Sequence, residues 1–466
     1  MFIKDGAGTL ISSNMLSRGY KGAFTVNDGT LNFTNDHYGV KALTINKGTV
    51  NLNSSRVNTI MNAAITVGSA SGDAANLNLM KNMNLNAGSS AAWDPDTGTP
   101  LSVFTLYKNG TVTLSADQSI AGNGEFKFIG GGTVTGKGKW ISALQKVIVE
   151  GANAEAFVET PLSFYSGKYK KEKHSIDVQD ASSVLTISGN ITNGTESSIT
   201  KKGAGKLVLS GTSLNYTGDT NVNAGILVLS NAANTMEYTS GILVADGATL
   251  QLDSTATIAA PISVAGRGLN AAGAVQFTGS ASLDGNVTLV EDSVFSVTAD
   301  KTATISGLLL GADKTLTKVG AGVLVLKPAE NGSEKLSYNI MDGLLQFDNA
   351  LDAGQIGLGN GSLALNNSSA LTADVLSFLN ANGSVFVDMT GLEAGKTLFS
   401  AENGMSVFTD AASAVQLSDA MRTFFLPGVQ TGNEMVFRVN SAAVPEPTAW
   451  ALLALGFFGM FWLRKR

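Results

Sequence analysis

The stretch that decides the fold reads GAGKLVLSGTSLNYTGDTNVNAGILVL and covers residues 203–229. It twice places leucines at alternate positions after a glycine, first at Leu207 and Leu209 and then at Leu227 and Leu229. Alternation with a period of two puts both leucines of a pair on one face of a β-strand. The glycine before each pair marks a turn that needs a positive φ or a close backbone approach. The stretch therefore predicts two short strands, each introduced by a tight turn.

The pattern glycine, any residue, apolar, any residue, apolar recurs along the chain. The glycines that open it are Gly29, Gly48, Gly110, Gly124, Gly205, Gly225, Gly285, Gly322, Gly343, Gly361 and Gly383. Several neighbouring copies lie 18 to 22 residues apart, as in Gly29 to Gly48, Gly205 to Gly225, Gly322 to Gly343 and Gly343 to Gly361. Repeats of this length stack so that neighbours share one core. We therefore expect an all-β fold, a right-handed parallel β-helix (β-solenoid). The alternative is an antiparallel sandwich, although its turns recur nearer to every ~8–12 residues.

The repeat density predicts the domain organisation. We expect solenoid repeats over 1–140, an irregular insertion over 141–183, further repeats over 184–370, a solenoid end or cap over 371–440 and a tail over 441–466. A short amphipathic helix is expected over 411–421. No basic and apolar leader precedes the first repeat, so we expect an N-terminally truncated piece or a start assigned too far downstream.

A local basic run, Ser166 to His174, lies inside the expected insertion. We expect a solvated loop there, with a patch for acidic polysaccharide as the alternative. His174 is expected to be an exposed loop residue and His37 an exposed turn residue.

Composition excludes several kinds of chemistry. The 466 residues include no cysteine and only two histidines, which rules out thiol nucleophiles, disulfides, cysteine zinc sites and most histidine catalysis. A net charge of -6 argues against a nucleic-acid partner. The acidic residues are scattered, and Glu291-Asp292 and Asp94-Pro95-Asp96 are interpreted as turns. We predict no catalytic residue, no metal and no cofactor.

These exclusions favour a non-enzymatic structural or adhesin-like protein, in which polar ladders of Asn, Ser and Thr would face a glycan or matrix. The alternative is a β-helix carbohydrate-active enzyme, either a polysaccharide lyase or a hydrolase, which would need clustered carboxylates.

The last residues form a tripartite tail. Pro445-Glu446-Pro447 is followed by an uncharged run, Trp450–Leu463, and by three terminal cations. As a helix the run is about 21 Å long, short of a bilayer core, but snorkelling basic residues extend it. Terminal cations favour the cytoplasm, so the body of the protein would lie outside. A buried core helix is the alternative, and the prolines and the basic end argue against it.

Residues 203–229 resemble the passenger-associated repeat of bacterial autotransporters. The resemblance is carried by Gly203, Gly205, Leu207, Leu209, Tyr216, Gly218, Thr220, Gly225 and Leu227. Partial copies of the repeat's start occur at 4–10 and 318–324. The resemblance implies a β-helical surface passenger. Autotransporters also carry a translocator barrel, which is not recognisable after residue 440, so the resemblance does not extend to the export route.

The tail resembles the PEP-CTERM sorting signal of Gram-negative bacteria, which is cleaved by exosortase, a membrane-embedded cysteine protease-transpeptidase. This implies a recognition motif at Pro445, Glu446 and Pro447, and a cytoplasmic stop at Arg464, Lys465 and Arg466. The implied membrane segment contains Trp450, Leu452, Leu453, Leu455, Phe457, Phe458, Met460, Phe461, Trp462 and Leu463. It also implies exosortase as a partner and a transient stay in the inner membrane. The expected precursor is exported and membrane-anchored, and its mature form lies on the cell surface or in the extracellular matrix.

Overall fold

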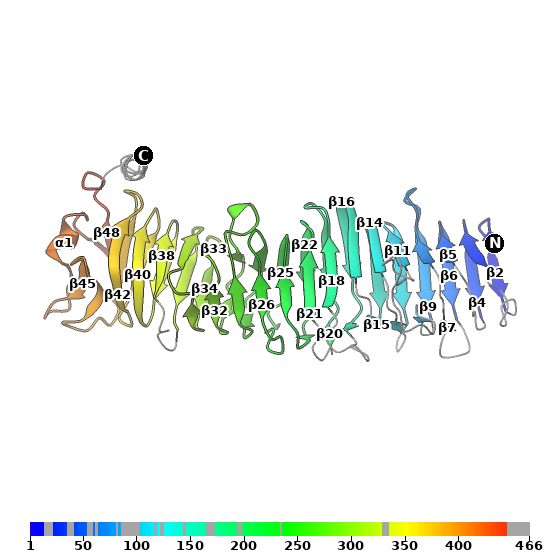
Figure 1. Ribbon diagram of the computed structural model, residues 1–466, viewed down its shortest axis with the longest axis horizontal. Coiled ribbons are helices and arrows are strands. Elements are labelled where there is room, and N and C mark those ends of the chain that lie inside the picture. Colours follow the sequence, from blue (N-terminus) through cyan, green and yellow to red (C-terminus); the bar gives the residue numbers. More distant parts are fainter. Residues whose placement is uncertain are drawn as a thin grey trace, which may run out of the picture. The chain divides into compact units, whose positions relative to one another are not determined.

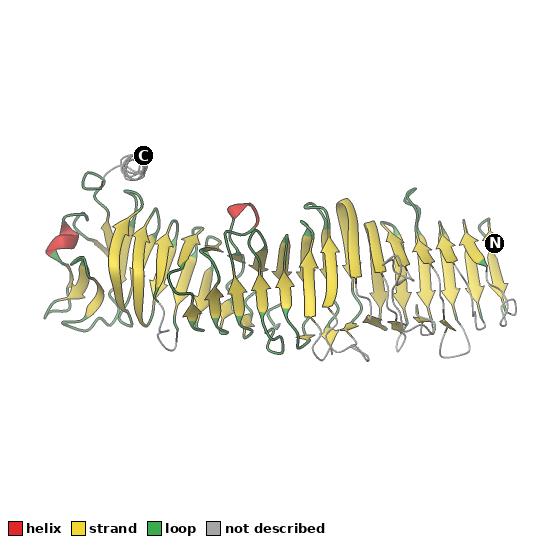
Figure 2. Cartoon of the chain, in the orientation of Figure 1, coloured by secondary structure: helices red, strands yellow, loops and turns green. Residues whose placement is uncertain are grey.

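The computed structural model describes most of the chain, in two compact units, Met1–Gln251 and Leu252–Arg466. The described residues are 1–13, 22–34, 42–53, 59–60, 64–80, 83–84, 103–115, 119–121, 125–142, 146–164, 173–192, 198–233, 235–328 and 335–444. Each unit is described by itself below, and strands dominate both (Figure 2).

The first unit is a β-solenoid whose coils contribute strands to three faces. The first face contains β1 (Phe2–Lys4), β3 (Ala23–Val26), β5 (Ala42–Ile45), β8 (Ala64–Val67), β11 (Val103–Tyr107), β18 (Lys173–Val178), β21 (Ser198–Lys202), β24 (Thr220–Val222) and β26 (Ile242–Val244). The second contains β2 (Thr9–Ser12), β4 (Thr30–Phe33), β6 (Gly48–Leu52), β9 (Ala75–Leu79), β12 (Gly110–Leu114), β19 (Val184–Ile187), β22 (Lys206–Leu209) and β25 (Ile226–Leu229). Two long strands, β14 (Glu125–Gly136) and β16 (Lys146–Val158), belong to both.

The third face of this unit is built from shorter strands. They are β7 (Thr59–Ile60), β10 (Met83–Asn84), β13 (Ser119–Ala121), β15 (Lys139–Ser142), β17 (Leu162–Phe164), β20 (Ile191–Thr192) and β23 (Leu214–Asn215). Strands of successive coils stand side by side (Figure 1) and pair in parallel on all three faces. The chain passes into the second unit within β27 (Thr249–Leu252).

The core of the first unit follows from the alternation in the sequence. Leu207 and Leu209 are fully buried, and Leu207 lies opposite Leu227 of the next coil. Phe33 likewise lies opposite Leu52. Burying one such side chain contributes about 1.5–3 kcal/mol, so the stacked column is what holds the coils together. The prediction of a parallel β-solenoid is confirmed.

The irregular insertion expected over 141–183 is wrong for the described residues. Strands β16 and β18 lie in this stretch and pair in parallel with the strands of neighbouring coils. The Gly-x-apolar-x-apolar pattern is missing here because β16 turns the corner through Gly151 and Asn153, both with positive φ, and continues as one strand. His174 lies on β18 and is 1% exposed, so its expected exposure in a loop is also wrong. Residues 166–172 of the basic run lie outside the described residues.

The second unit is also a β-solenoid with parallel pairing. One face contains β28 (Thr257–Ile258), β31 (Ser282–Leu283), β34 (Thr302–Ile305), β37 (Val323–Leu326), β39 (Leu344–Phe347), β41 (Ser362–Leu365) and β43 (Ser384–Asp388). A second face contains β29 (Ile262–Val264), β32 (Val287–Leu289) and β35 (Leu309–Leu310). A third face contains β30 (Val275–Phe277), β33 (Ser293–Val297), β36 (Thr315–Val319), β38 (Leu336–Ile340), β40 (Ala350–Leu358) and β42 (Ala370–Phe378). A single 3-10 turn, η1 (Leu269–Ala271), interrupts the described strands of this unit.

Strand pairing changes from parallel to antiparallel at the end of the second unit. After β44 (Thr397–Ala401) come β45 (Ser406–Thr409) and β46 (Val415–Leu417), and each pairs antiparallel with the strand before it. Strand β48 (Glu434–Arg438) folds back onto β43, and β47 (Val429–Thr431) pairs with β48. We refer to residues 397–444 as the cap. An antiparallel cap covers the strand edges of a last coil, which would otherwise offer unpaired N–H and C=O groups.

The amphipathic helix expected over 411–421 is wrong over most of its length. Val415 and Leu417 alternate on β46, which pairs with β45. Ser418 then caps α1 (Asp419–Arg422), where its Oγ accepts the Met421 N–H at 3.4 Å. The pairing of β46 with β45 therefore replaces the expected helix up to Ser418, which is the N-cap of α1.

Candidate functional site: the repeat coil and the end of the cap

The glycines of the repeat are required by the approach of one coil to the next. Gly203 has a φ of 73°, and a Cβ there would lie 2.2 Å from the Val178 carbonyl oxygen. Gly225 has a φ of 65°, and a Cβ there would lie 2.4 Å from the Gly205 carbonyl oxygen. Any other side chain at these positions would both strain the backbone and push the coils apart.

A buried lysine precedes the repeat's paired glycines. The Lys201 side chain is 0% exposed, and its Nζ donates to three carbonyl oxygens. Two belong to the next turn of its own coil, Lys202 at 2.6 Å and Gly203 at 2.8 Å. The third is Ala224 at 3.1 Å, which lies just before the following copy's glycine. One ammonium group thus ties two successive coils together.

The same arrangement occurs in two further copies of the repeat. In the second unit, Lys318 is 0% exposed and donates to the carbonyl oxygens of Val319, Gly320 and Asp342 at 3.1, 2.6 and 3.1 Å. At the start of the first unit, Lys4 makes the corresponding bonds to three carbonyl oxygens, at 3.1, 2.5 and 3.1 Å. The reasoning from sequence missed this role. The signal that could have found it is the recurrence of Lys-x-Gly-Ala-Gly at 4–8, 201–205 and 318–322.

Burial changes the acidity of two of these lysines. Desolvation lowers the pKa of Lys201 to about 8, with Asp177 opposing the shift. Desolvation also lowers the pKa of Lys318 to about 8, and here Asp342 opposes it. Both amines are therefore protonated at neutral pH, where all three of their hydrogens are available for the carbonyl oxygens.

The tyrosine of the repeat closes its turn from inside. Tyr216 is fully buried, and its hydroxyl lies 2.6 Å from Thr220 Oγ1. Thr239 of the next coil donates to the Gly218 carbonyl oxygen at 2.9 Å and lies 3.5 Å from Thr220 Oγ1. Burial raises the pKa of Tyr216 to about 12, so the phenol stays neutral. Together with Gly205, Leu209 and Leu227, which are buried, these residues place the predicted repeat motif in one packed coil.

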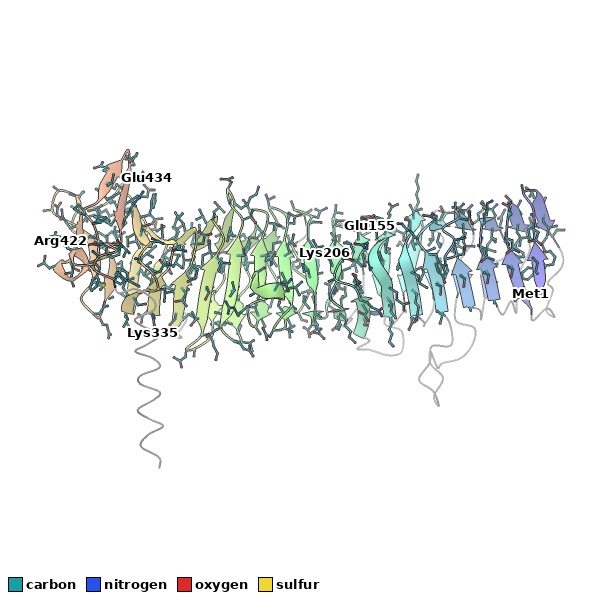
Figure 3. All side chains as sticks on the ribbon, turned by 90° about the horizontal axis from the view of Figure 1, so that it is seen from above. Met1, Glu155, Lys206, Lys335, Arg422 and Glu434 are labelled. Atoms are coloured by element: carbon teal, nitrogen blue, oxygen red, sulfur yellow. The ribbon has the colours of Figure 1, made fainter. Side chains whose placement is uncertain are left out.

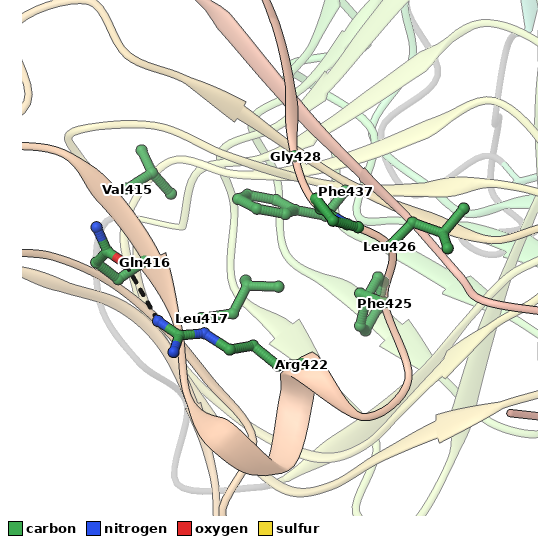
Figure 4. A pocket seen from close by; sticks show the side chains of 9 residues that line it. Val415, Gln416, Leu417, Arg422, Phe425, Leu426, Gly428 and Phe437 are labelled. Atoms are coloured by element: carbon green, nitrogen blue, oxygen red, sulfur yellow. Dashed lines mark hydrogen bonds between the residues drawn. The ribbon is translucent and has the colours of Figure 1, made fainter.

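Two cavities lie in the second unit near the cap. The first, of about 380 Å³, is lined by Val415, Leu417, Phe425 and Phe437, and Arg422 donates across it to Gln416 at 3.2 Å (Figure 4). The second, of about 420 Å³, is lined by Asn366, Asn433 and two carboxylates, Asp388 and Glu434. These two residues are register partners on β43 and β48.

The other acidic residues and the histidine singled out from the sequence give weaker evidence for a chemical site. Glu291 and Asp292 are both exposed, as expected of turn residues, and Asp292 accepts the Thr315 N–H at 2.8 Å. No cluster of His, Cys, Asp and Glu among the described residues has the geometry of a metal site. Asp94, Asp96 and His37 lie outside the described residues.

The described chain ends on a buried residue of the cap. Val444 is 7% exposed, and the turn before it is held by Ala443 N–H to the Asn440 carbonyl oxygen at 2.9 Å. The Asn440 N–H in turn donates to the Phe424 carbonyl oxygen at 2.7 Å. The predicted motif Pro445-Glu446-Pro447 follows Val444 directly in sequence, and it lies outside the described residues with the rest of the tail. Within the described part, no helix has the length and apolarity to span a bilayer.

Two family models match the chain. The passenger-associated-transport-repeat matches residues 2–33, 199–229 and 224–252, and the PEP-CTERM protein-sorting motif matches residues 443–466. The chain carries a PEP-CTERM sorting motif and passenger-associated repeats. The repeat match at 2–33 extends the partial copy expected at 4–10, and the copy at 224–252 adds a coil to the one expected at 203–229. No curated protein and no solved structure matches the chain significantly.

The sorting motif and the solenoid repeats together fit an exported surface protein. The motif implies processing by exosortase. The match at 199–229 contains Lys201, Tyr216 and Gly225, so it rests on residues whose packing roles are given above.

Proposed function

We propose that the chain is the precursor of a non-enzymatic, adhesin-like surface or matrix protein, released from the inner membrane when exosortase cuts at its tail. The observation that carries the proposal is the match of residues 443–466 to the sorting motif, placed directly after a folded solenoid. The solenoid would hold a binding surface away from the cell. A stack of coils that share one core suits this role because each coil is braced by its neighbours.

The experiment is the intact mass and the C-terminal peptide of the native protein from surface and membrane fractions. Processing predicts a surface form that lacks Arg464–Arg466. A variant with Pro445, Glu446 and Pro447 replaced by alanine should stay uncut in the membrane fraction. Glu434→Ala, an exposed change in the cap, is the matched control and should be processed normally. Normal processing of the triple-alanine variant would refute the proposal, as would a surface form that keeps the basic end.

The second candidate function is a carbohydrate-active enzyme. It is favoured by one observation, the pair Asp388 and Glu434 lining a cavity of about 420 Å³. Paired carboxylates are what glycoside hydrolysis needs. Release of reducing ends or unsaturated products from common polysaccharides, abolished by Asp388→Asn, would favour the enzyme. Equal product release by the native chain and the variant would argue against it.

A further inference from the structure

The second face of the first unit carries two uninterrupted rows of uncharged polar side chains. One row runs through Thr30, Thr49, Asn76, Thr111 and Thr133, which pair in register from β4 to β14. The second row runs beside it through Asn32, Asn51, Asn78, Thr113 and Thr135. The ten positions of these two rows, on the second-face part of five successive strands, are therefore all threonine or asparagine. We call these two rows the polar track.

The track has a regular geometry. Neighbouring residues of one row lie about 4.8 Å apart across the sheet, and the two rows lie about 6.6 Å apart along the strands. Asn51 Nδ2 donates to Asn32 Oδ1 at 2.6 Å, and Asn78 Nδ2 donates to Asn51 Oδ1 at 2.7 Å. This ladder uses one hydrogen of each donating amide, and an amide carries two. Threonine is stiff at χ1, so its hydroxyls are held in place before any ligand arrives.

The first row leads to an exposed aromatic side chain. Thr133 pairs with Phe157 on β16, and Phe157 pairs in turn with Thr186 on β19. Phe157 is 38% exposed, although burial is the usual state of a phenylalanine in a strand. Glu155 and Glu159 point outward on either side of it, and Figure 3 shows Glu155 outside the ribbon. Thr135 Oγ1 donates to Glu159 Oε2 at 2.6 Å.

We infer that the polar track and Phe157 form a binding surface for an uncharged linear polysaccharide. Sugar hydroxyls both donate and accept hydrogen bonds, as threonine hydroxyls and asparagine amides do, and the C–H face of a sugar ring packs on an aromatic ring. From Thr30 to Thr186 the row spans about 29 Å, which suits an extended chain rather than a single sugar. The inference rests on the proposed surface role and names its ligand class.

Charge selects between kinds of polymer. No ionisable side chain occurs among the ten track positions, and the coil of Phe157 presents the two carboxylates of Glu155 and Glu159. A polyanion such as a uronic-acid polymer or a nucleic acid would meet repulsion at Phe157 and no cation on the track. The ten track positions offer no carboxylate to a polycation either, so the surface fits an uncharged polymer.

The first face of the same unit provides a contrast. It also carries a threonine row, Thr25, Thr44, Thr66 and Thr105. That row ends at Lys127, which is paired with Glu125 at 3.0 Å and with Glu150 at 3.2 Å. It has one row of hydroxyls, no exposed aromatic side chain in register and a closed ion-pair cluster at its end. It serves as the matched control surface.

The test is affinity electrophoresis of the full chain in gels containing cellulose derivatives, mannan, xylan, β-1,3-glucan or amylose, with alginate as the anionic comparison. We expect retardation by at least one neutral polymer and none by alginate. Phe157→Ala and Thr49→Val/Thr111→Val should each weaken binding about tenfold or more, because each removes contact area or hydroxyls from an exposed surface. Thr44→Val/Thr66→Val and Tyr238→Ala, an exposed aromatic residue elsewhere on the unit, should bind as the native chain does.

Three results would overturn the inference. They are no retardation by any neutral polymer, equal binding by the track variants and the native chain, and a dimer in solution that Thr49→Val/Thr111→Val dissociates. The last would mean that a second copy covers the track. Far-ultraviolet circular dichroism of each variant shows whether it is folded. Failure here leaves the sorting proposal intact, because processing is read from the tail and does not involve this face.

Discussion

Replacing Lys201 by methionine tests how the coils are tied together. The variant keeps an unbranched side chain, one atom shorter, and removes three hydrogen bonds to carbonyl oxygens, at 2.6, 2.8 and 3.1 Å. A hydrogen bond to a charged group contributes about 1.5–3 kcal/mol, so the gross loss is about 4.5–9 kcal/mol. Methionine also removes a buried charge, and relief of its desolvation offsets several kcal/mol of that loss. We expect a net destabilisation of about 3 kcal/mol.

Hydrogen exchange of the amides in β22 and β25 is the suitable assay, because a solenoid opens locally and one global unfolding free energy would not isolate this coil. A loss of about 3 kcal/mol corresponds to exchange roughly a hundredfold faster. Lys202→Met is the control, since Lys202 is the exposed neighbour. Exchange in Lys201→Met within about threefold of that control would refute the role assigned to the buried ammonium.

Three further predictions concern pH, glycine and processing. Because the pKa of Lys201 is about 8 when folded and 10.5 when exposed, the unfolded chain holds more protons between these values, and the stability that Lys201 gives its coil should rise over that interval. The chain has no cysteine, so a fluorophore on one cysteine introduced into this coil can report its urea unfolding. From pH 7.5 to pH 10 the gap in stability between the labelled native chain and labelled Lys201→Met should widen, and a constant gap would contradict the shift. Gly225→Ala should destabilise its coil by at least about 2 kcal/mol, because its Cβ would lie 2.4 Å from the Gly205 carbonyl oxygen. If the amides of that coil exchange as slowly in the variant as in the native chain, neighbouring coils can move apart without losing stability and the prediction is wrong. A flexible insertion between Val444 and Pro445 should speed processing, because Val444 is buried in the cap and leaves the protease no linker; an unchanged rate in a pulse-chase would show that the cap does not hinder access.

Much of the solenoid could be predicted from local pattern. The alternation at Leu207 and Leu209 fixes which side chains face inward, and both are fully buried. The pattern is readable because a strand's period of two is a property of a few consecutive residues. The same reasoning failed where a corner is turned without the Gly-x-apolar-x-apolar pattern, as at Gly151 and Asn153 of β16, and so the stretch that contains the regular strands β16 and β18 was expected to be irregular.

The candidate sites also differ in whether the sequence alone could identify them. The sorting motif at Pro445-Glu446-Pro447 is a linear signal, so the sequence alone identifies it. The two carboxylates Asp388 and Glu434 are far apart in sequence and meet only because β48 folds back onto β43. No spacing rule could have paired them, since the turn that reverses the chain lies between them and outside any repeat.

The sequence by itself determined the repeat, the inward face of each strand and the sorting tail, because these depend on neighbouring residues. Only the tertiary structure decided that Lys201 is buried, since the third carbonyl oxygen that accepts a hydrogen bond from it, that of Ala224, arrives with the next coil. It likewise decided that Phe157 continues the row of Thr133. Register between coils depends on the lengths of the turns and on what they bury, and neither is encoded in any one strand.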